Sequence, residues 1–316
     1  MGRTRPLAAV TVGMGLALFV ISACTVTPSV PFSHWQFEGF RVVSYIPEDP
    51  SGIVYVFHGS KGSAAFAEKV ETVDVLNELI ERGYGFVATE STERTGNRRW
   101  NVSNPSLSTN PDLARLTRLH DHLIDTSPIS DSTPIVGLGM SNGARFGSLF
   151  GQSWADAAYP VEAIAMYMGS IAAPIEAAGG LTVPTLFVTA ENDFTSPPGP
   201  IIADYSATDA AGTPSGLLVA EEQALSAARF LLIRGIDNPE ANAVVAALVN
   251  AGVWNQAGAR VVSMDVAVSR LTSVTFPPST TAQRVEIADQ CALVLAAHQM
   301  RGDLRLQTAD FFDQHR

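Results

Sequence analysis

Residues 134–143 read Pro-Ile-Val-Gly-Leu-Gly-Met-Ser-Asn-Gly, an apolar run that ends in the pattern G-x-S-x-G. The run predicts a buried strand, and the residues after it predict a helix. At such a strand–turn–helix junction the serine backbone is strained, and glycines on either side leave room for it. The turn would place the Ser141 hydroxyl above the sheet edge, at a helix N-terminus that favours negative charge. The alternative interpretation is a tight strand–helix connection without chemistry.

Two further apolar runs, 52–57 and 184–190, lead into segments that carry chemical groups. The first ends at the loop 58–62 (HGSKG), where a tightly turned backbone can direct N–H groups at an oxyanion. The second ends at residues 191–193 (END), and a carboxylate just past a late strand is well placed to orient a histidine. Alternation of short apolar strands with helices also predicts a parallel sheet that is covered on both faces.

With these features in this order, the chain resembles the α/β-hydrolase superfamily over residues 35–195. The resemblance implies an α/β fold with a mostly parallel central sheet and helices on both faces. It also implies Ser141 as nucleophile, Asp193 as the acid that orients a histidine, and the backbone N–H groups of Ser60 and Asn142 as the oxyanion hole. Such an enzyme needs no metal or organic cofactor.

The histidine of the superfamily follows the acid in sequence, which leaves His298 and His315. We favour His298, because an apolar terminal helix follows it, whereas His315 is the penultimate residue and would suffer from fraying. Since 292–297 itself has a helical pattern, a capping role for His298 at a helix end stays open. Asp193 has three acidic competitors, Glu191, Asp204 and Asp209.

Residues 196–280 fit the alternating pattern less well and predict a partly helical insertion after the acid-bearing strand. Segments 224–232 and 240–249 predict short helices, while 261–264 and 271–276 are candidate strands that could close the sheet. The insertion either packs near the active-site mouth or is a peripheral extension, and the pattern does not choose between them.

The polar loop 90–109 carries Arg98, Arg99 and Trp100 and could line the acyl or alcohol side of a substrate. In having a tryptophan near this place, the loop resembles polyester depolymerases and feruloyl-esterase-like enzymes. We favour the simpler interpretation, in which Trp100 packs the loop against the core.

The N-terminus predicts export. Residues 1–23 combine early arginines with a short apolar run, which is typical of a signal peptide and too short for a membrane span. Cys24 ends the sequence Ile-Ser-Ala-Cys, which resembles the lipobox of bacterial lipoproteins. We therefore expect lipidation at Cys24, a tether over 24–34, a hydrolase domain over 35–316, and anchoring to the bacterial cell envelope. The alternative is an ordinary signal peptide and a secreted or periplasmic protein.

Charge and residue spacing argue against two other classes, nucleic-acid-binding proteins and metalloproteins. A formal charge of −11 disfavours nucleic-acid binding. His120 and His122 point to different faces of a helix, so we interpret them as part of a solvated surface and predict no metal site. Cys291 lies in an apolar helical pattern and is expected to be a core residue.

These inferences predict a serine hydrolase that cleaves carboxylic esters through an acyl-enzyme intermediate, acting on a small-molecule or polymeric ester. Two alternatives stay open: a thioesterase or acyltransferase on the same scaffold, and a catalytically silent envelope lipoprotein that binds acyl compounds.

Overall fold

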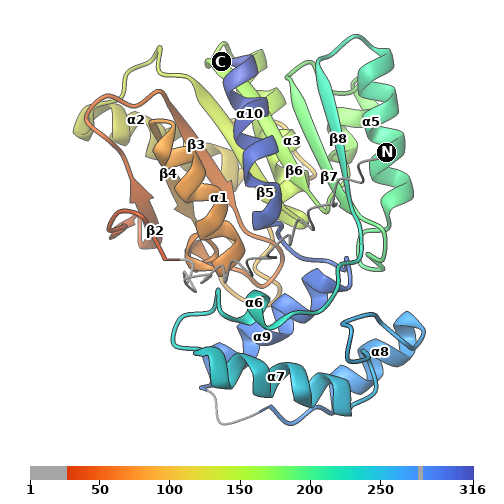
Figure 1. The fold of residues 1–316 in the computed structure, drawn as a ribbon. Coiled ribbons are helices and arrows are strands. Elements are labelled where there is room, and N and C mark those ends of the chain that lie inside the picture. The colour runs from red at the N-terminus through yellow and green to blue at the C-terminus, as the bar shows by residue number, and fades with distance from the viewer. Residues whose placement is uncertain (1–26, 277–279) are drawn as a thin grey trace, which may run out of the picture.

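The computed structural model describes residues 27–276 and 280–316. Within this part of the chain, the strands form one sheet in the order β1-β2-β4-β3-β5-β6-β7-β8 (Figure 1). The pairs β1–β2 and β2–β4 are antiparallel, and every other neighbouring pair is parallel. The strands are β1 (Ser33–Phe37), β2 (Phe40–Tyr45), β3 (Gly52–Phe57), β4 (Tyr84–Thr89), β5 (Ile135–Met140), β6 (Val161–Tyr167), β7 (Thr185–Ala190) and β8 (Ser215–Ala220).

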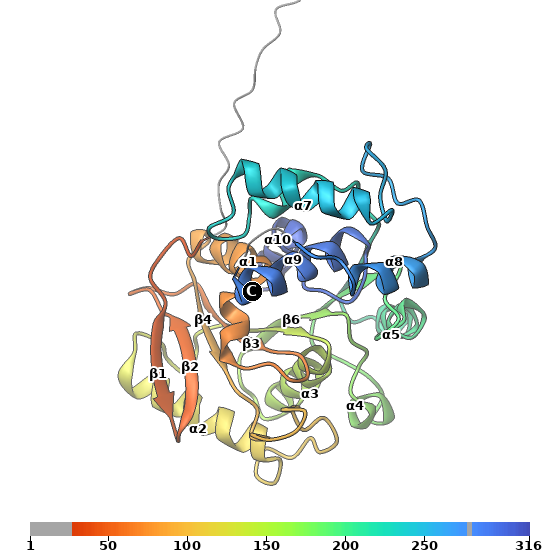
Figure 2. The same ribbon diagram turned by 90° about the horizontal axis from the view of Figure 1, so that it is seen from below.

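Helices cover both faces of the sheet (Figure 2). One face packs against η1 (Ala64–Glu68), α1 (Val70–Glu81) and α10 (Arg305–His315), the last preceded by the short η2 (Gly302–Leu304). The other face packs against α2 (Pro111–Thr126), α3 (Asn142–Asp156), α4 (Ala173–Ala177) and α5 (Pro198–Ala210). This is the α/β-hydrolase arrangement, so the predicted fold class is confirmed.

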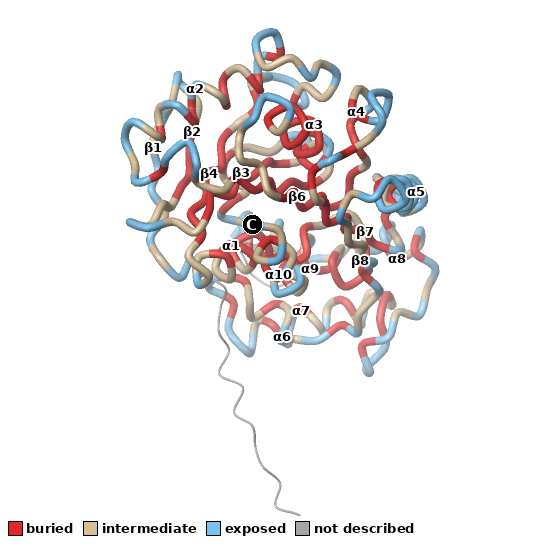
Figure 3. Tube along the Cα trace, turned by 90° about the horizontal axis from the view of Figure 1, so that it is seen from above, coloured by how far each residue is buried: buried red, intermediate tan, exposed pale blue. Residues whose placement is uncertain are grey.

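The central strands are buried along their whole length, as the burial-coloured trace shows (Figure 3). Every residue of β3, β4, β5 and β7 is buried. A parallel strand between two helical layers has no solvent-facing side, and for this reason its sequence is continuously apolar rather than alternating.

A helical cap follows β8, and we use this name for the helices α6 (Ala227–Phe230), α7 (Asn238–Asn250), α8 (Met264–Leu271) and α9 (Thr281–Val294). The cap lies below the sheet in Figure 1 and has a hydrophobic core of its own, which includes the buried Phe230, Leu248, Trp254 and Ile287. The helices predicted near 224–232 and 240–249 are present as α6 and α7.

Two features of the predicted insertion are corrected by the structure. The candidate strands at 261–264 and 271–276 are wrong: these segments flank α8 and share only its first and last residues, Met264 and Leu271, and the rest of both segments is neither strand nor helix. Residues 198–220, placed in the insertion by the sequence, instead belong to the α/β core as α5 and β8. Pro198 occupies the first turn of a helix, where a proline is tolerated, rather than breaking the chain.

The predicted signal peptide (1–23) and Cys24 lie outside the described residues. At the start of the described chain, the Asn77 side chain binds the segment before β1 to α1. It accepts a hydrogen bond from the Ser29 N–H (2.7 Å) and donates one to the Thr27 carbonyl (2.8 Å). Among the described helices, none combines the length and apolarity that crossing a membrane requires.

Candidate active site

Ser141 occupies the strained turn that its sequence context predicts. It follows β5 directly and caps α3, with φ 59° and ψ −121°. A positive φ is unfavourable for a residue with a Cβ, so the surroundings must hold it there. The Ser141 N–H donates to the Tyr167 carbonyl of the neighbouring strand β6 (2.8 Å), which anchors the turn to the sheet.

The glycines on either side of Ser141 are required by close backbone contacts. A Cβ on Gly139 would collide with the carbonyl of Gly143, and a Cβ on Gly143 would collide with the carbonyl of Phe57 at the end of β3. The G-x-S-x-G spacing therefore has a steric basis in this chain, since only glycine permits both approaches.

Asp193 and His298 are brought together from segments far apart in the sequence. Asp193 follows β7, and its side chain is fully buried. One carboxylate oxygen accepts the Nδ1–H of His298 at 2.7 Å, while the other accepts the backbone N–H groups of Thr195 and Ser196, each at 2.8 Å. These bonds hold the carboxylate in one orientation, which in turn fixes the imidazole ring.

His298 lies in a loop and not in a helix. The apolar run 292–297 starts as the end of α9, but the helix ends at Val294 and Ala296 has φ 50°. Asn192 joins this loop to the end of β7: its N–H donates to the Ala296 carbonyl (3.0 Å) and its side chain to the Leu295 carbonyl (2.9 Å). Glu191 and Asp204, which competed with Asp193 in the sequence, instead accept backbone N–H groups of Glu222 and Ile171.

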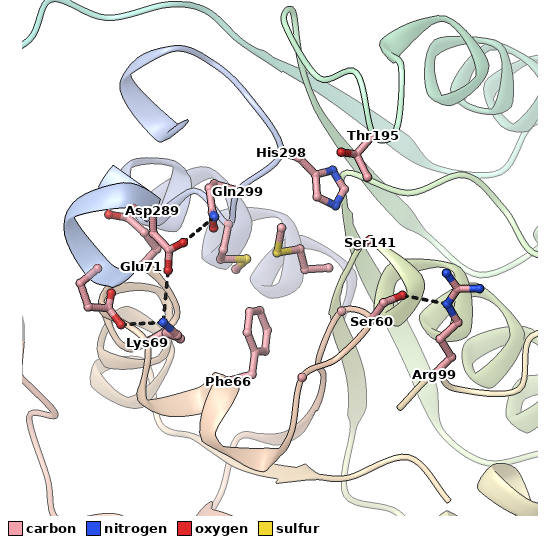
Figure 4. A pocket seen from close by; sticks show the side chains of 15 residues that line it. Ser60, Phe66, Lys69, Glu71, Arg99, Ser141, Thr195, Asp289, His298 and Gln299 are labelled. Carbon is pink, nitrogen blue, oxygen red and sulfur yellow. Dashed lines mark hydrogen bonds and ion pairs between the residues drawn. The ribbon is translucent and has the colours of Figure 1, made fainter. Parts of the chain in front are cut away.

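Ser141 and His298 line one cavity of about 410 Å³ (Figure 4). Phe66, Met140 and Met300 give it an apolar lining. Within the described residues no hydrogen bond joins Ser141 Oγ to the His298 ring. Such bonds are often long in the absence of substrate, and the shared cavity still places both groups within reach of one ligand.

The predicted oxyanion loop, residues 58–62, lies against Ser141. A Cβ built on Gly59 would be 3.3 Å from the Ser141 Cβ and 3.9 Å from its Oγ, so the backbone before Ser60 passes beside the hydroxyl. The Asn142 N–H belongs to the first turn of α3, where amides have no intrahelical acceptor. The Asn142 side chain makes two hydrogen bonds to the Trp100 backbone: its oxygen accepts the Trp100 N–H (2.7 Å), and its amide donates to the Trp100 carbonyl (3.3 Å).

His58 shapes the oxyanion loop, a role that the sequence did not reveal beyond its place in the HG motif. It is buried, its Nδ1–H donates to the Gly59 carbonyl (2.7 Å), and its Nε2 accepts the Ser91 N–H (3.2 Å). Burial lowers the pKa of His58, so the ring stays neutral in the tautomer that this pattern requires.

Trp100 packs the loop 90–109 against the core, as predicted. The indole is 2% exposed and stacks on Phe146, with ring centroids 4.6 Å apart. Its Nε1–H donates to the His58 carbonyl (3.0 Å). The same tryptophan therefore supports both the loop 58–62 and, through Asn142, the turn that carries Ser141.

The remaining histidines and the cysteine have structural surroundings. The interpretation of His120 as a solvated residue is wrong: it is buried against β3 and its Nδ1 lies 2.9 Å from the Tyr55 hydroxyl. His122 is half-exposed and stacks on Phe37. Cys291 is a buried core residue, as predicted, and burial raises the pKa of its thiol to about 12. In the part of the chain that is described, no cluster of acidic, histidine or cysteine side chains is suited to a metal ion.

Comparison with known proteins gives structural neighbours only. No model of a protein family matches the sequence, and no curated protein sequence matches it. Among solved structures the chain is similar to an arylesterase (13% identity, 63% of this chain and 79% of that one, TM-score 0.46). It is also similar to a ferulic acid esterase (13%, 60% and 89%, 0.47) and to an acetyl xylan esterase from Aspergillus awamori (13%, 54% and 76%, 0.42). At these values the likenesses say nothing about the substrate of this chain.

Proposed function

We propose that this chain is a serine hydrolase that cleaves carboxylic esters through an acyl-enzyme intermediate. The observation that carries the proposal is the arrangement around one cavity: the strained Ser141 and His298, with His298 held by the buried carboxylate of Asp193. A nucleophile, a base and a group that orients the base are the parts that acyl transfer by serine requires.

In this proposal each group has one task. Ser141 Oγ attacks the ester carbonyl while His298 Nε2 takes its proton, and the imidazolium then protonates the departing alcohol. Asp193 keeps the proton on Nδ1, which leaves Nε2 free to act as the base. The N–H groups of Ser60 and Asn142 stabilise the oxyanion, a contribution of about 10²–10³ in rate for each donor. Water, activated by His298, releases the acid.

The test compares two histidines that follow Asp193 in the sequence. We expect His298→Ala to lower kcat/KM for a short-chain 4-nitrophenyl ester by about 10³-fold or more, because Ser141 then has no base. His315→Ala, in the last turn of α10 and outside the cavity, should stay within about threefold of the wild type. Thermal melts establish that both variants are folded. Near-normal turnover in folded His298→Ala would contradict the assignment of the base.

We further propose that the enzyme is exported and anchored to the cell envelope by a lipid on Cys24. The charged and apolar start of the chain and the Ile-Ser-Ala-Cys sequence support this localisation. Globomycin, which blocks the lipoprotein signal peptidase, should then cause an unprocessed form to accumulate in a bacterial host. Unchanged processing of Cys24→Ala would contradict lipidation and favour an ordinary signal peptide.

A further inference from the structure

The cavity that holds Ser141 differs in charge between its two sides (Figure 4). On the cap side, Lys69 Nζ is bound by two acids, Glu286 at 2.8 Å and Asp289 at 3.1 Å. Glu71 lines the same side. Glu71 itself lies 3.7 Å from Arg229, but Lys69 faces two carboxylates, so this side of the cavity keeps an excess of negative charge and would repel an anionic group.

Arg99 stands on the opposite side, next to the oxyanion loop. Its Nε–H donates to the Ser60 hydroxyl at 3.3 Å. Across residues 27–276 and 280–316, no carboxylate lies within ion-pair distance of the Arg99 guanidinium. The nearby Glu93 carboxylate is already engaged by backbone N–H groups, those of Asn97 (3.3 Å) and Arg99 itself (2.8 Å).

The backbone that carries Arg99 is fixed. Its N–H is held by Glu93, and the next residue, Trp100, is buried and bonded through its backbone to the side chain of Asn142. The backbone of Arg99 is therefore held on both sides of its Cα, close to Ser141. This anchoring sets the point from which the Arg99 side chain extends, while the guanidinium itself is exposed and its planar fork matches the geometry of a carboxylate.

We propose that Arg99 binds a free carboxylate of the substrate, so that the preferred substrates are esters that carry a second, unesterified carboxyl group. This inference rests on the proposed function and names its substrate class. A guanidinium can bind a carboxylate through two parallel hydrogen bonds, which fixes orientation as well as affinity. The acidic cap side of the cavity repels a carboxylate, and this disfavours binding of the substrate with its free carboxylate turned toward the cap.

The experiment compares matched ester pairs that differ in one charge. For the acyl side, mono(4-nitrophenyl) adipate is compared with 4-nitrophenyl hexanoate. For the alcohol side, 4-acetoxybenzoate is compared with 4-acetoxybenzamide. The measured quantity is the ratio of kcat/KM for the charged ester to that for its neutral partner, in the wild type, Arg99→Gln, Arg99→Lys and Arg98→Gln.

We expect the wild type to prefer the charged member of at least one pair by about tenfold, which is typical of a hydrogen bond to a charged group. Arg99→Gln should bring this ratio down to about one, and Arg99→Lys should retain part of the preference. Arg98→Gln is the matched control, because the neighbouring Arg98 lines a separate small pocket of about 90 Å³. It should keep the wild-type ratio.

A wild-type ratio of one or below in both pairs would overturn the inference, as would an equal fall in Arg98→Gln. These outcomes leave the proposed function standing, since the enzyme still turns over neutral esters. Failure of the proposed function has a different signature, in which the folded wild type hydrolyses none of the four esters.

Discussion

Ser141 keeps an unfavourable backbone conformation because its neighbours leave it no other. A positive φ at a non-glycine residue costs about 1–3 kcal/mol and persists only where the surroundings over-determine it. Here the hydrogen bond to Tyr167 and the close backbone contacts at Gly139 and Gly143 supply that constraint. Strain of this kind, at the edge of a cavity, is typical of a functional residue.

The orientation of His298 depends on the charge and the acceptor character of Asp193. Asp193→Asn keeps the shape of the side chain, but its amide group is a donor and favours the wrong tautomer of the imidazole. We expect kcat for a short-chain ester to fall by about 10³–10⁴-fold, measured at pH 7 with a thermal melt to verify folding. Glu191→Gln, on the exposed neighbouring acid, is the control and should stay near the wild type. A small effect of Asp193→Asn would remove Asp193 from the mechanism.

Sequence patterns located Ser141 and Asp193 because both follow mostly apolar strands that are buried along their whole length. The pairing of His298 with Asp193 needed the fold, since 292–297 has a helical pattern although the helix ends at Val294 and the backbone turns at Ala296. The buried states of His58 and His120 were missed for a related reason. Burial depends on which strand a side chain meets, and no local pattern encodes that.

The loop 90–109 connects β4 to α2 and packs against the loop 58–62 through Trp100. Asn110 is fully buried at the N-cap of α2 and accepts the N–H groups of Asp112 (3.0 Å) and Leu113 (3.3 Å). Its amide also donates to the carbonyls of Asn101 (3.0 Å) and Asn104 (2.6 Å). One side chain therefore caps the helix and closes the loop that carries Arg99 and Trp100.

Asn110→Ala should affect both stability and activity. Loss of the cap should lower the free energy of unfolding by about 1–2 kcal/mol, and loosening of the Trp100 loop should lower kcat/KM by about tenfold or more. Asp237→Ala removes the exposed N-cap of α7, which also has a capping box, and serves as the control. It should cost about 1 kcal/mol with unchanged activity. Denaturant titration gives the free energy of unfolding of each variant, and activity is compared in samples that it shows to be folded. Equal activity of the two variants would contradict the connection between Asn110 and the cavity of Ser141.

The elements that the sequence predicts wrongly are those whose hydrophobic pattern is weak. β8 is only half-buried along most of its length, so it lacks the continuous apolar run that marks β3 or β5. α8 is short and buries few residues against the cap core, so the sequence does not mark it as a helix, and the apolar segments 261–264 and 271–276 that flank it were interpreted as strands. In both cases tertiary packing, rather than local propensity, determines the structure.

In the molecule as a whole, Glu71 connects the cap, the core and the His298 loop. From α1 it accepts the Gln290 amide of α9 (2.8 Å) and the Gly302 N–H that follows the histidine loop (2.7 Å). Arg229 of the cap lies 3.7 Å from the same carboxylate. Burial raises the pKa of Glu71. The cap is therefore joined to the loop that carries His298 by polar contacts as well as by its hydrophobic core.

Stability should depend on pH through the two buried histidines. Burial lowers the pKa of His58 and of His120 from the ordinary value of about 6.5. The unfolded chain then binds more protons than the folded one below that pH, so their contribution is complete above about pH 6.5 and is lost as the pH falls. We expect a lower melting temperature at pH 5.5 than at pH 7.5.

His120→Gln removes the contribution of His120 to this effect, and His120 does not line the cavity of Ser141. The variant loses the hydrogen bond to Tyr55, which should cost about 1–3 kcal/mol at pH 7.5. The difference in melting temperature between pH 7.5 and pH 5.5 should nevertheless be smaller than in the wild type. An unchanged difference would show that His120 does not titrate on unfolding.

The proposed function requires Ser141 to be an activated nucleophile, and reaction with a fluorophosphonate probe tests this directly. The readout is mass spectrometry of the intact protein and of its peptides. We expect one covalent adduct on Ser141 in the wild type and none in folded Ser141→Ala. Equal labelling of the two proteins, or a folded wild type that does not react, would contradict it.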